Sequence, residues 1–156
     1  MSTFKTSRSF SAPPEAVFAA FSNPERLARW WGPDGFSNNF ETFEFWSGGA
    51  WRFTMVGPDN SNYQNISTFE SIVPDRLVVV KHVSQPHFTL SIMLEPSAAG
   101  TTVTWEQAFD SPEVAASLKH IVEPANEQNL SRWQAEVMKA MLISPGEMVA
   151  THERGL

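Results

Sequence analysis

Residues 126–141, NEQNLSRWQAEVMKAM, carry the pattern that decides the fold. Leu130, Trp133, Val137 and Met141 recur at spacings of three and four residues, which predicts one apolar stripe along an α-helix. Polar and charged residues fill most of the positions between them. Burying each of these apolar side chains is worth about 1.5 to 3 kcal/mol, so we expect docking against another element to decide whether the helix forms.

Start and stop signals set the limits of this helix and of a shorter one before it. Glu123-Pro124 is typical of a helix start and Ser144-Pro145-Gly146 of a stop, so the long helix is expected to end at about Leu142. Ser111-Pro112-Glu113 predicts a separate short helix that runs to about Lys119. We therefore expect two helices in the C-terminal third of the chain.

The segment before these helices predicts an antiparallel meander. Its apolar residues recur at every second position, and glycine- or proline-containing turns interrupt it at short intervals. The polar residues gather on one side, which indicates a sheet with one solvated face and one buried face. Strands are expected at residues 36–46, 51–55, 63–72, 77–82, 88–94 and 102–109.

One further strand and two short helices are expected near the N-terminus. Residues 3–10 alternate as a strand does, and Pro13-Pro14 then introduces a helix over Glu15–Phe21. Asn23 followed by Pro24 is a helix start, and Gly32 ends that second helix. The fold class is therefore α+β, with a curved antiparallel sheet of about six to seven strands wrapped around a long C-terminal helix.

The length of the chain favours a single domain. A chain of 156 residues can bury roughly 70% of its unfolded surface around one core. We expect one domain over residues 1–156, with an ordered core at about residues 3–142 and a fraying tail at residues 145–156.

Composition argues against several classes of function. The net charge of −6, with no long Lys/Arg cluster, disfavours nucleic-acid binding. The absence of cysteine excludes a disulfide framework and thiolate catalysis. No apolar run approaches the 18 or so residues of a membrane span, and the first ten residues lack the apolar region of a signal peptide. We expect a cytoplasmic protein without a membrane span.

The order of elements and three short motifs resemble known families. Strand, two short helices, meander and long helix together are similar to the helix-grip architecture of START-like (SRPBCC) domains. Trp30-Trp31-Gly32-Pro33, Gly48-Gly49-Ala50-Trp51-Arg52 and Pro74-Asp75-Arg76-Leu77-Val78 resemble the family of the C-terminal domain of the activator of the heat-shock-protein-90 chaperone ATPase, here as a stand-alone homologue. The resemblance covers roughly residues 3–142. Where that family often begins the long helix with Gly-Trp, this chain has Pro124-Ala125-Asn126, so ligand identity does not carry over.

A curved sheet that grips one helix tends to leave a mostly apolar space between the two, so we expect a ligand cavity there. Four polar residues of the expected inner faces, Asn65, His82, Gln107 and Asn126, are the most informative candidates, because a buried polar group needs a partner. Backbone groups or water could equally satisfy each of these four, and each apolar lining candidate could be an ordinary core residue. The expected ligand-binding residues are Trp31, Phe36, Phe53, Asn65, Phe69, His82, Phe88, Trp105, Gln107, Asn126, Leu130 and Trp133, with Met55, Val80 and Val137 as further lining candidates.

The sequence offers few groups for catalysis. His82, His87, His120 and His152 show no metal-ligand spacing, so no metal is expected, and neither a phosphate-binding glycine loop nor a nucleophile elbow is present. No cofactor is expected. His82 is the one candidate for acid–base chemistry, provided that it faces the cavity rather than solvent.

Three functions remain open at this stage. The first, which we favour, is a non-catalytic binding module for a small hydrophobic or aromatic molecule. The second is a cyclase- or dehydratase-like enzyme that uses His82 with Asn65 or Gln107. The third, implied by the family resemblance, is association with a chaperone or another protein. A homodimer is possible in each case.

Overall fold

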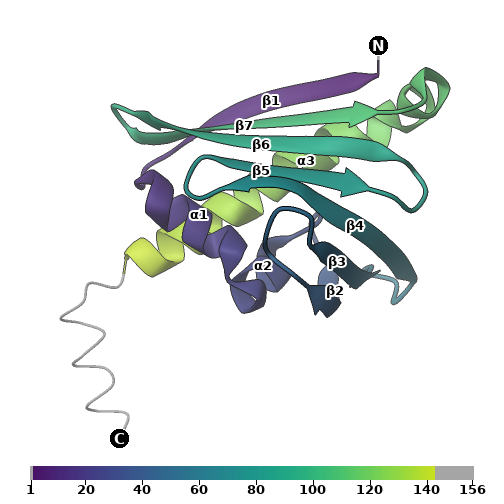
Figure 1. Cartoon of the computed structure of the whole chain (residues 1–156), viewed down its shortest axis with the longest axis horizontal. Coiled ribbons are helices and arrows are strands. Elements are labelled where there is room, and N and C mark those ends of the chain that lie inside the picture. The colour runs from purple at the N-terminus through teal and green to yellow at the C-terminus, as the bar shows by residue number, and fades with distance from the viewer. Residues whose placement is uncertain (1, 143–156) are drawn as a thin grey trace, which may run out of the picture.

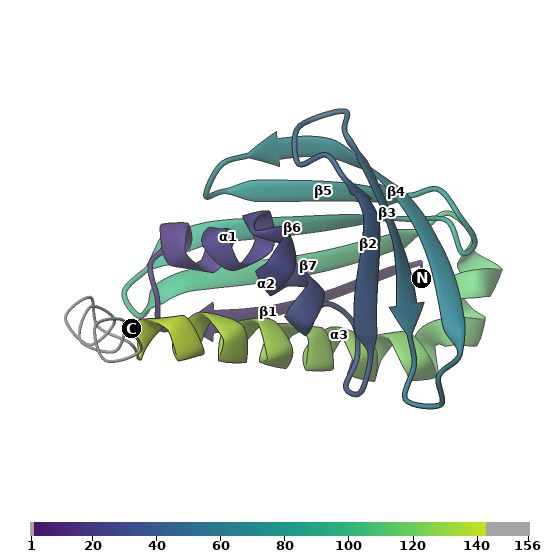
Figure 2. The ribbon, with the colours of Figure 1, turned by 90° about the horizontal axis from the view of Figure 1, so that it is seen from below.

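The computed structural model describes residues 2–142, so the tail expected at residues 145–156, like His152, lies outside the described residues. Seven antiparallel strands form one sheet in the order β1-β7-β6-β5-β4-β3-β2, and α1 and α2 follow β1. The sheet curves around α3, which runs along its concave side (Figures 1 and 2). The elements are β1 (Thr3–Phe10), α1 (Pro14–Ser22), α2 (Pro24–Trp30), β2 (Ser37–Phe43), β3 (Ala50–Val56), β4 (Asn62–Val73), β5 (Leu77–His82), β6 (Phe88–Ser97), β7 (Gly100–Phe109) and α3 (Pro112–Met141).

The strands form where the sequence alternates, and their inward residues build the concave face. In β7, Val103, Trp105, Gln107 and Phe109 are buried, while Thr104, Glu106 and Ala108 between them are only partly covered. Irregular pairing occurs twice, between Phe40 and Thr42 in β2 and between Phe69 and Ser71 in β4. Such bulges increase the local twist of a strand and help a sheet to bend around a helix. The α+β helix-grip prediction is confirmed.

The two short helices begin at the predicted signals. α1 starts directly after Pro13, and Pro14 occupies its first turn. At the start of α2 the Asn23 side-chain oxygen accepts hydrogen bonds from the backbone N–H groups of Glu25 at 3.0 Å and Arg26 at 3.2 Å. These bonds satisfy two of the donors that every helix N-terminus leaves open.

The prediction of two separate C-terminal helices is wrong, because α3 continues through Pro124. A proline inside a helix removes one N–H donor and crowds the preceding turn, but packing on both sides can hold the helix together. Ala115 before Pro124 and Leu130 after it are both fully buried. The first turns of α3 lie at an angle to the rest of the helix (Figure 1).

The predicted apolar stripe of α3 is shorter than expected. Leu130, Trp133 and Val137 are buried, but Met141 is 47% exposed. By its last turn the helix has passed the edge of the core, since Lys139 and its neighbours there are exposed as well. The strand expected at residues 36–46 is also shorter, because β2 ends at Phe43.

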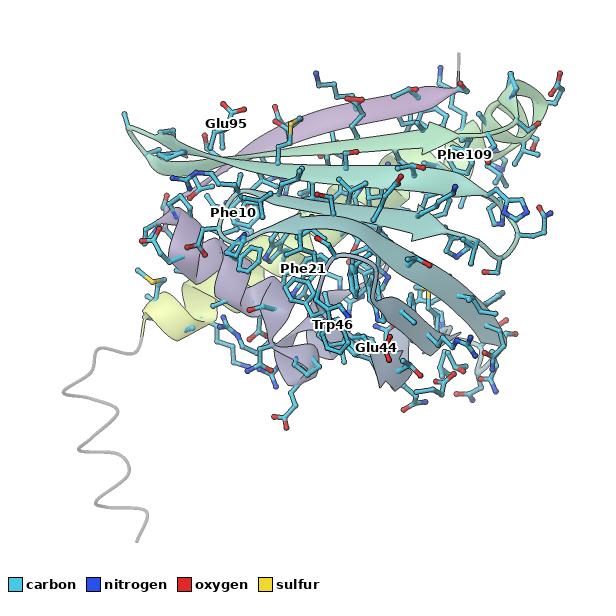
Figure 3. All side chains as sticks on the ribbon, viewed as in Figure 1. Phe10, Phe21, Glu44, Trp46, Glu95 and Phe109 are labelled. Carbon is cyan, nitrogen blue, oxygen red and sulfur yellow. The ribbon has the colours of Figure 1, made fainter. Side chains whose placement is uncertain are left out.

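An aromatic core fills the end of the concave face that α1 and α2 cover. The Trp30 and Trp133 rings stack 4.8 Å apart at 3°, and Phe21 packs against both. Phe21 lies among these side chains, whereas Trp46 lies at the outer edge near the short strands (Figure 3). At the centre is Trp51, whose ring contacts those of Phe21, Trp31, Phe40, Phe43, Phe53 and Phe69.

Candidate ligand-binding pocket

A pocket of about 160 Å³ lies between the sheet and α3, beside the aromatic core. Strands β3, β6 and β7 form its floor, α3 forms its roof, and the loop between α2 and β2 closes one side. Ile121, which is 54% exposed, stands at its edge and marks the side open to solvent. The lining residues are Trp31, Gly32, Pro33, Met55, Phe88, Leu90, Trp105, Gln107, Ile121, Val122, Ala125, Asn126 and Asn129.

The pocket brings together residues that are far apart in the sequence. Of the expected ligand-binding residues, Trp31, Phe88, Trp105, Gln107 and Asn126 line it. Their part in binding a ligand stays a prediction. The lining by Ile121 and Val122 was missed, because the sequence analysis placed these two residues between a short helix that ends at about Lys119 and a long one that begins at Glu123.

Most of the remaining expected residues lie outside the pocket. Phe53 and Phe69 pack against Trp51, with ring centroids 4.5 and 5.4 Å apart, and Trp133 packs on Trp30. The helices α1 and α2 cover that end of the concave face (Figure 2), and the aromatic rings pack against one another there. Phe36 faces Tyr63 at 6.0 Å instead. Leu130, Val80 and Val137 are likewise buried core residues that do not line the pocket.

Three side-chain amides lie among the apolar walls of the pocket. Asn126 Nδ2 donates to Gln107 Oε1 at 3.1 Å, and Asn129 Oδ1 accepts from the backbone N–H of Gly32 at 2.9 Å. Within the described residues, these bonds leave Gln107 Nε2, Asn126 Oδ1 and Asn129 Nδ2 for another partner. The amides can therefore offer both donors and an acceptor to a bound molecule.

Trp105, which lines the pocket, carries a further donor in its indole N–H. This N–H is buried, and it has no hydrogen-bond partner in the part of the chain that the structure describes. A buried donor without a partner costs about 1 to 3 kcal/mol, so such groups usually have a reason to exist. Trp105 lines the pocket, which makes a ligand acceptor one such reason.

Arg132 of α3 holds the loop that closes one side of the pocket. Its Nη1 donates to the carbonyl oxygens of Gly32 and Pro33, both at 2.8 Å. Its Nη2 donates to those of Arg29 at 2.8 Å and Phe36 at 3.1 Å. Burial lowers the pKa of Arg132, and Asp34 opposes this effect. Arg132 is one of the charged residues between the apolar positions of α3, and no local pattern in the sequence indicated this role.

His82 is buried on the inner face of β5 but does not line the pocket. Its ring stacks on Phe88, with centroids 4.5 Å apart at 7°. Its Nδ1 lies 2.7 Å from the Pro86 carbonyl oxygen and its Nε2 lies 2.7 Å from Asn65 Oδ1. Both ring nitrogens are therefore engaged, and burial lowers the pKa of His82. Neither ring nitrogen of His82 is free to act on a molecule in the pocket, so this geometry does not support the enzyme hypothesis.

Residues 2–142 contain neither a cluster of metal-ligating side chains nor a helix that could span a membrane. Between residues 2 and 142, His, Asp and Glu side chains do not gather in threes as a metal site would require. Over the same residues, every helix is too short or too polar to cross a membrane.

The curved seven-stranded sheet, the long C-terminal helix on its concave side and the two short helices after β1 define a START-like, helix-grip protein. Residues 11–142 match the family described as "Activator of Hsp90 ATPase homolog 1-like protein", and the chain belongs to this family.

Solved structures share this fold at low sequence identity. A protein of Nitrosomonas europaea is 16% identical, with a TM-score of 0.82 over 90% of this chain and 96% of its own. The AHSA1 protein of Silicibacter pomeroyi is 22% identical, with a TM-score of 0.73 over 88% of this chain and 99% of its own. None of the curated proteins compared with this chain is a significant match. Because one fold serves many functions, the fold alone does not assign a function to this protein. Its function is therefore inferred from the residues of the pocket.

Proposed function

We propose that this protein binds a small, neutral, largely apolar molecule in the pocket between the sheet and α3. The observation that carries the proposal is the buried Trp105 N–H, which lacks a partner among the described residues beside a mostly apolar wall. Ligand pockets typically combine such walls with a few polar groups that orient the ligand. An acceptor on the ligand would give the Trp105 donor its partner.

The size of the pocket supports a compact ligand. Sites for drug-sized molecules measure about 300 to 1,000 Å³, whereas an apolar cavity of about 150 Å³ is large enough for benzene. At about 160 Å³ the pocket matches one ring with a small substituent.

The lining also supports a neutral ligand. None of the described side chains that line the pocket is charged. A charged group that entered would lose hydration without gaining a counter-ion, which is strongly unfavourable. An amide, a hydroxyl or a ketone suits the free groups of Gln107, Asn126 and Asn129.

Family membership supports a second candidate, association with a chaperone, because the family description names an activator of the Hsp90 ATPase. A pull-down with the purified chaperone tests it independently of any small molecule. This candidate is supported if the chaperone retains the protein and if mutation of surface residues away from the pocket abolishes that retention.

Nuclear magnetic resonance tests the binding proposal directly. Phenol, benzamide and acetophenone are titrated into the protein labelled with ¹⁵N. We expect at least one of them to shift the Trp105 indole signal together with the side-chain amide signals of Gln107 and Asn126. If every compound leaves these signals unmoved up to its solubility limit, the proposal fails.

A matched pair of variants tests the role of the Trp105 donor. Trp51 is also buried and its N–H also lacks a partner among the described residues, but it does not line the pocket. We expect W105F to weaken binding about fivefold to tenfold, the value of one hydrogen bond, and W51F to leave it unchanged. Equal effects of the two substitutions would exclude the Trp105 indole as a ligand donor.

A further inference from the structure

A second depression lies on the other side of Asn126, outside the pocket. It measures about 260 Å³ and runs between β1 and α3. Asn126 lines both spaces. The residues of this outer groove are Phe4, Lys5, Thr6, Glu123, Pro124, Asn126 and Glu127.

Asn126, which lines both spaces, is hydrogen-bonded to Gln107, which lines the pocket alone. Gln107 lines the pocket and pairs across the sheet with Phe4, which lines the groove. Asn126 donates to Gln107 at 3.1 Å, and the two side chains are 9% and 7% exposed. Asn126 is thus the residue that the two spaces share, and its bonded partner Gln107 lies beside the groove residue Phe4 in the sheet.

The bond between Gln107 and Asn126 joins two neutral side chains. The neighbouring contact between β1 and α3 is charged, because Arg8 donates to Glu127 Oε1 at 3.0 Å and to Ser131 Oγ at 2.6 Å. Hydrogen bonds that involve ions are stronger than those between neutral groups. Rotation of Asn126 or Gln107 can thus break the bond between them while β1 stays attached to α3.

The groove has a chemical character unlike that of the pocket. Lys5, Glu123 and Glu127 contribute charges of both signs, and Thr6 adds a hydroxyl group. A ligand end placed there would meet polar groups and solvent, whereas the end in the pocket would meet Trp31, Phe88 and Trp105.

We propose that the Gln107–Asn126 pair is a partition between the pocket and the outer groove, and that it determines the length of ligand that this protein accepts. With the pair closed, the pocket takes a single-ring neutral molecule. With the pair open, the site takes an elongated molecule with an apolar ring in the pocket and a polar end in the outer groove. This inference rests on the proposed binding function.

The test compares benzamide with its two-ring analogue biphenyl-4-carboxamide in four proteins. These are the unaltered protein, N126A, Q107A and N126L. N126A and Q107A shorten one member of the pair, whereas N126L removes the hydrogen bond but keeps a side chain of similar size. Folding of each variant is checked from its backbone amide spectrum, and the two alanine variants provide independent tests of the same partition.

We expect the unaltered protein to prefer benzamide. N126L should bind benzamide more weakly, because it loses an amide that lines the pocket, but with either compound it should show no added shifts at Phe4 and Thr6. N126A or Q107A should improve the affinity for biphenyl-4-carboxamide relative to benzamide about tenfold or more, and the added shifts should appear at Phe4 and Thr6. An unchanged preference in both alanine variants would overturn the partition while leaving the pocket intact. Equal binding of the two compounds to the unaltered protein would overturn it as well. If benzamide shifts no pocket signal, the binding function itself fails, and this inference with it.

Discussion

Arg132 Nη1 on α3 donates to the carbonyl oxygen of Gly32 at 2.8 Å, and this bond ties the roof of the pocket to its side wall. α2 ends just before Gly32, where a helix leaves carbonyl groups without partners. A cation close to such carbonyls is favourable, because the C-terminal end of a helix carries partial negative charge. Trp31, Gly32 and Pro33 all line the pocket, so the position of one side wall depends on Arg132.

Removing this cation should loosen the loop. We expect R132M to lower the free energy of unfolding by about 2 kcal/mol, since several carbonyl groups lose a charged donor. R132K should recover part of the loss, because it keeps the charge but not the planar fork of donors. Chemical denaturation measures the stability, and hydrogen exchange of the Phe36 amide reports on the loop. K139M, an exposed change on the same helix, is the control; equal stability of R132M and K139M would contradict this role.

Gly32 should resist substitution for two separable reasons. Its φ is +98°, and a Cβ placed there would lie 2.6 Å from Met55 Cε. Gly48 has a similar φ of +92°, but a Cβ there meets nothing within 4 Å. We expect G48A to cost about 1 kcal/mol from backbone strain, and G32A to cost somewhat more, because the flexible end of Met55 must move and Phe36 Cβ lies only 3.3 Å from the added atom. Thermal unfolding of both variants gives the difference. If G32A is as stable as G48A or more stable, the contact with Met55 does not limit substitution at Gly32.

The buried His82 ring should make stability depend on pH. Burial lowers its pKa below the ordinary value of 6.5, with the charge of nearby His87 acting in the same direction, while hydrogen bonds at Pro86 and Ser84 oppose the change. The unfolded chain therefore binds the proton more readily than the folded one. The stability contributed by the neutral ring is present above pH 6.5 and is lost as the pH falls below it, by at most about 1.4 kcal/mol per pH unit.

A histidine replacement isolates this effect. The free energy of unfolding is measured from pH 7.5 to 5.5, and we expect a smaller decline in H82Q than in the unaltered protein. H120Q, an exposed change on α3, should keep the full decline. The same decline in H82Q and in the unaltered protein would show that His82 does not cause it.

Pro124 should limit the stability of α3. It lies inside the helix and cannot donate to the carbonyl oxygen of His120. We expect P124A to raise the free energy of unfolding by about 1 to 2 kcal/mol, because the restored bond outweighs the added freedom of the unfolded chain. Pro112 occupies the first turn, where proline is favourable, so P112A should not stabilise the protein. A loss of stability in P124A, measured by thermal unfolding, would contradict this account.

The sheet and its inner face were predictable because each depends on local alternation. Val103, Trp105 and Gln107 alternate with polar neighbours, and all three are buried in β7. The caps of α2 and α3 were predictable for the same reason, since Asn23 and Ser111 act on backbone groups two or three residues away.

The position of the pocket was not predictable in the same way, because it depends on packing between distant segments. Alternation places Phe53, Phe69 and Trp105 on one face of the sheet, but it does not say which end of that face α1 and α2 cover. Only Trp105 of these three lines the pocket. The continuation of α3 through Pro124 also depends on tertiary contacts, which no local signal contains.

The most direct test is a crystal structure of the protein soaked with benzamide. We expect the benzamide ring to lie between Trp105 and α3. The carbonyl oxygen of benzamide should lie within hydrogen-bond distance of Trp105 Nε1, and its amide nitrogen near Gln107 or Asn126. A pocket that stays free of benzamide at saturating concentration, or benzamide bound only elsewhere on the protein, would contradict this expectation.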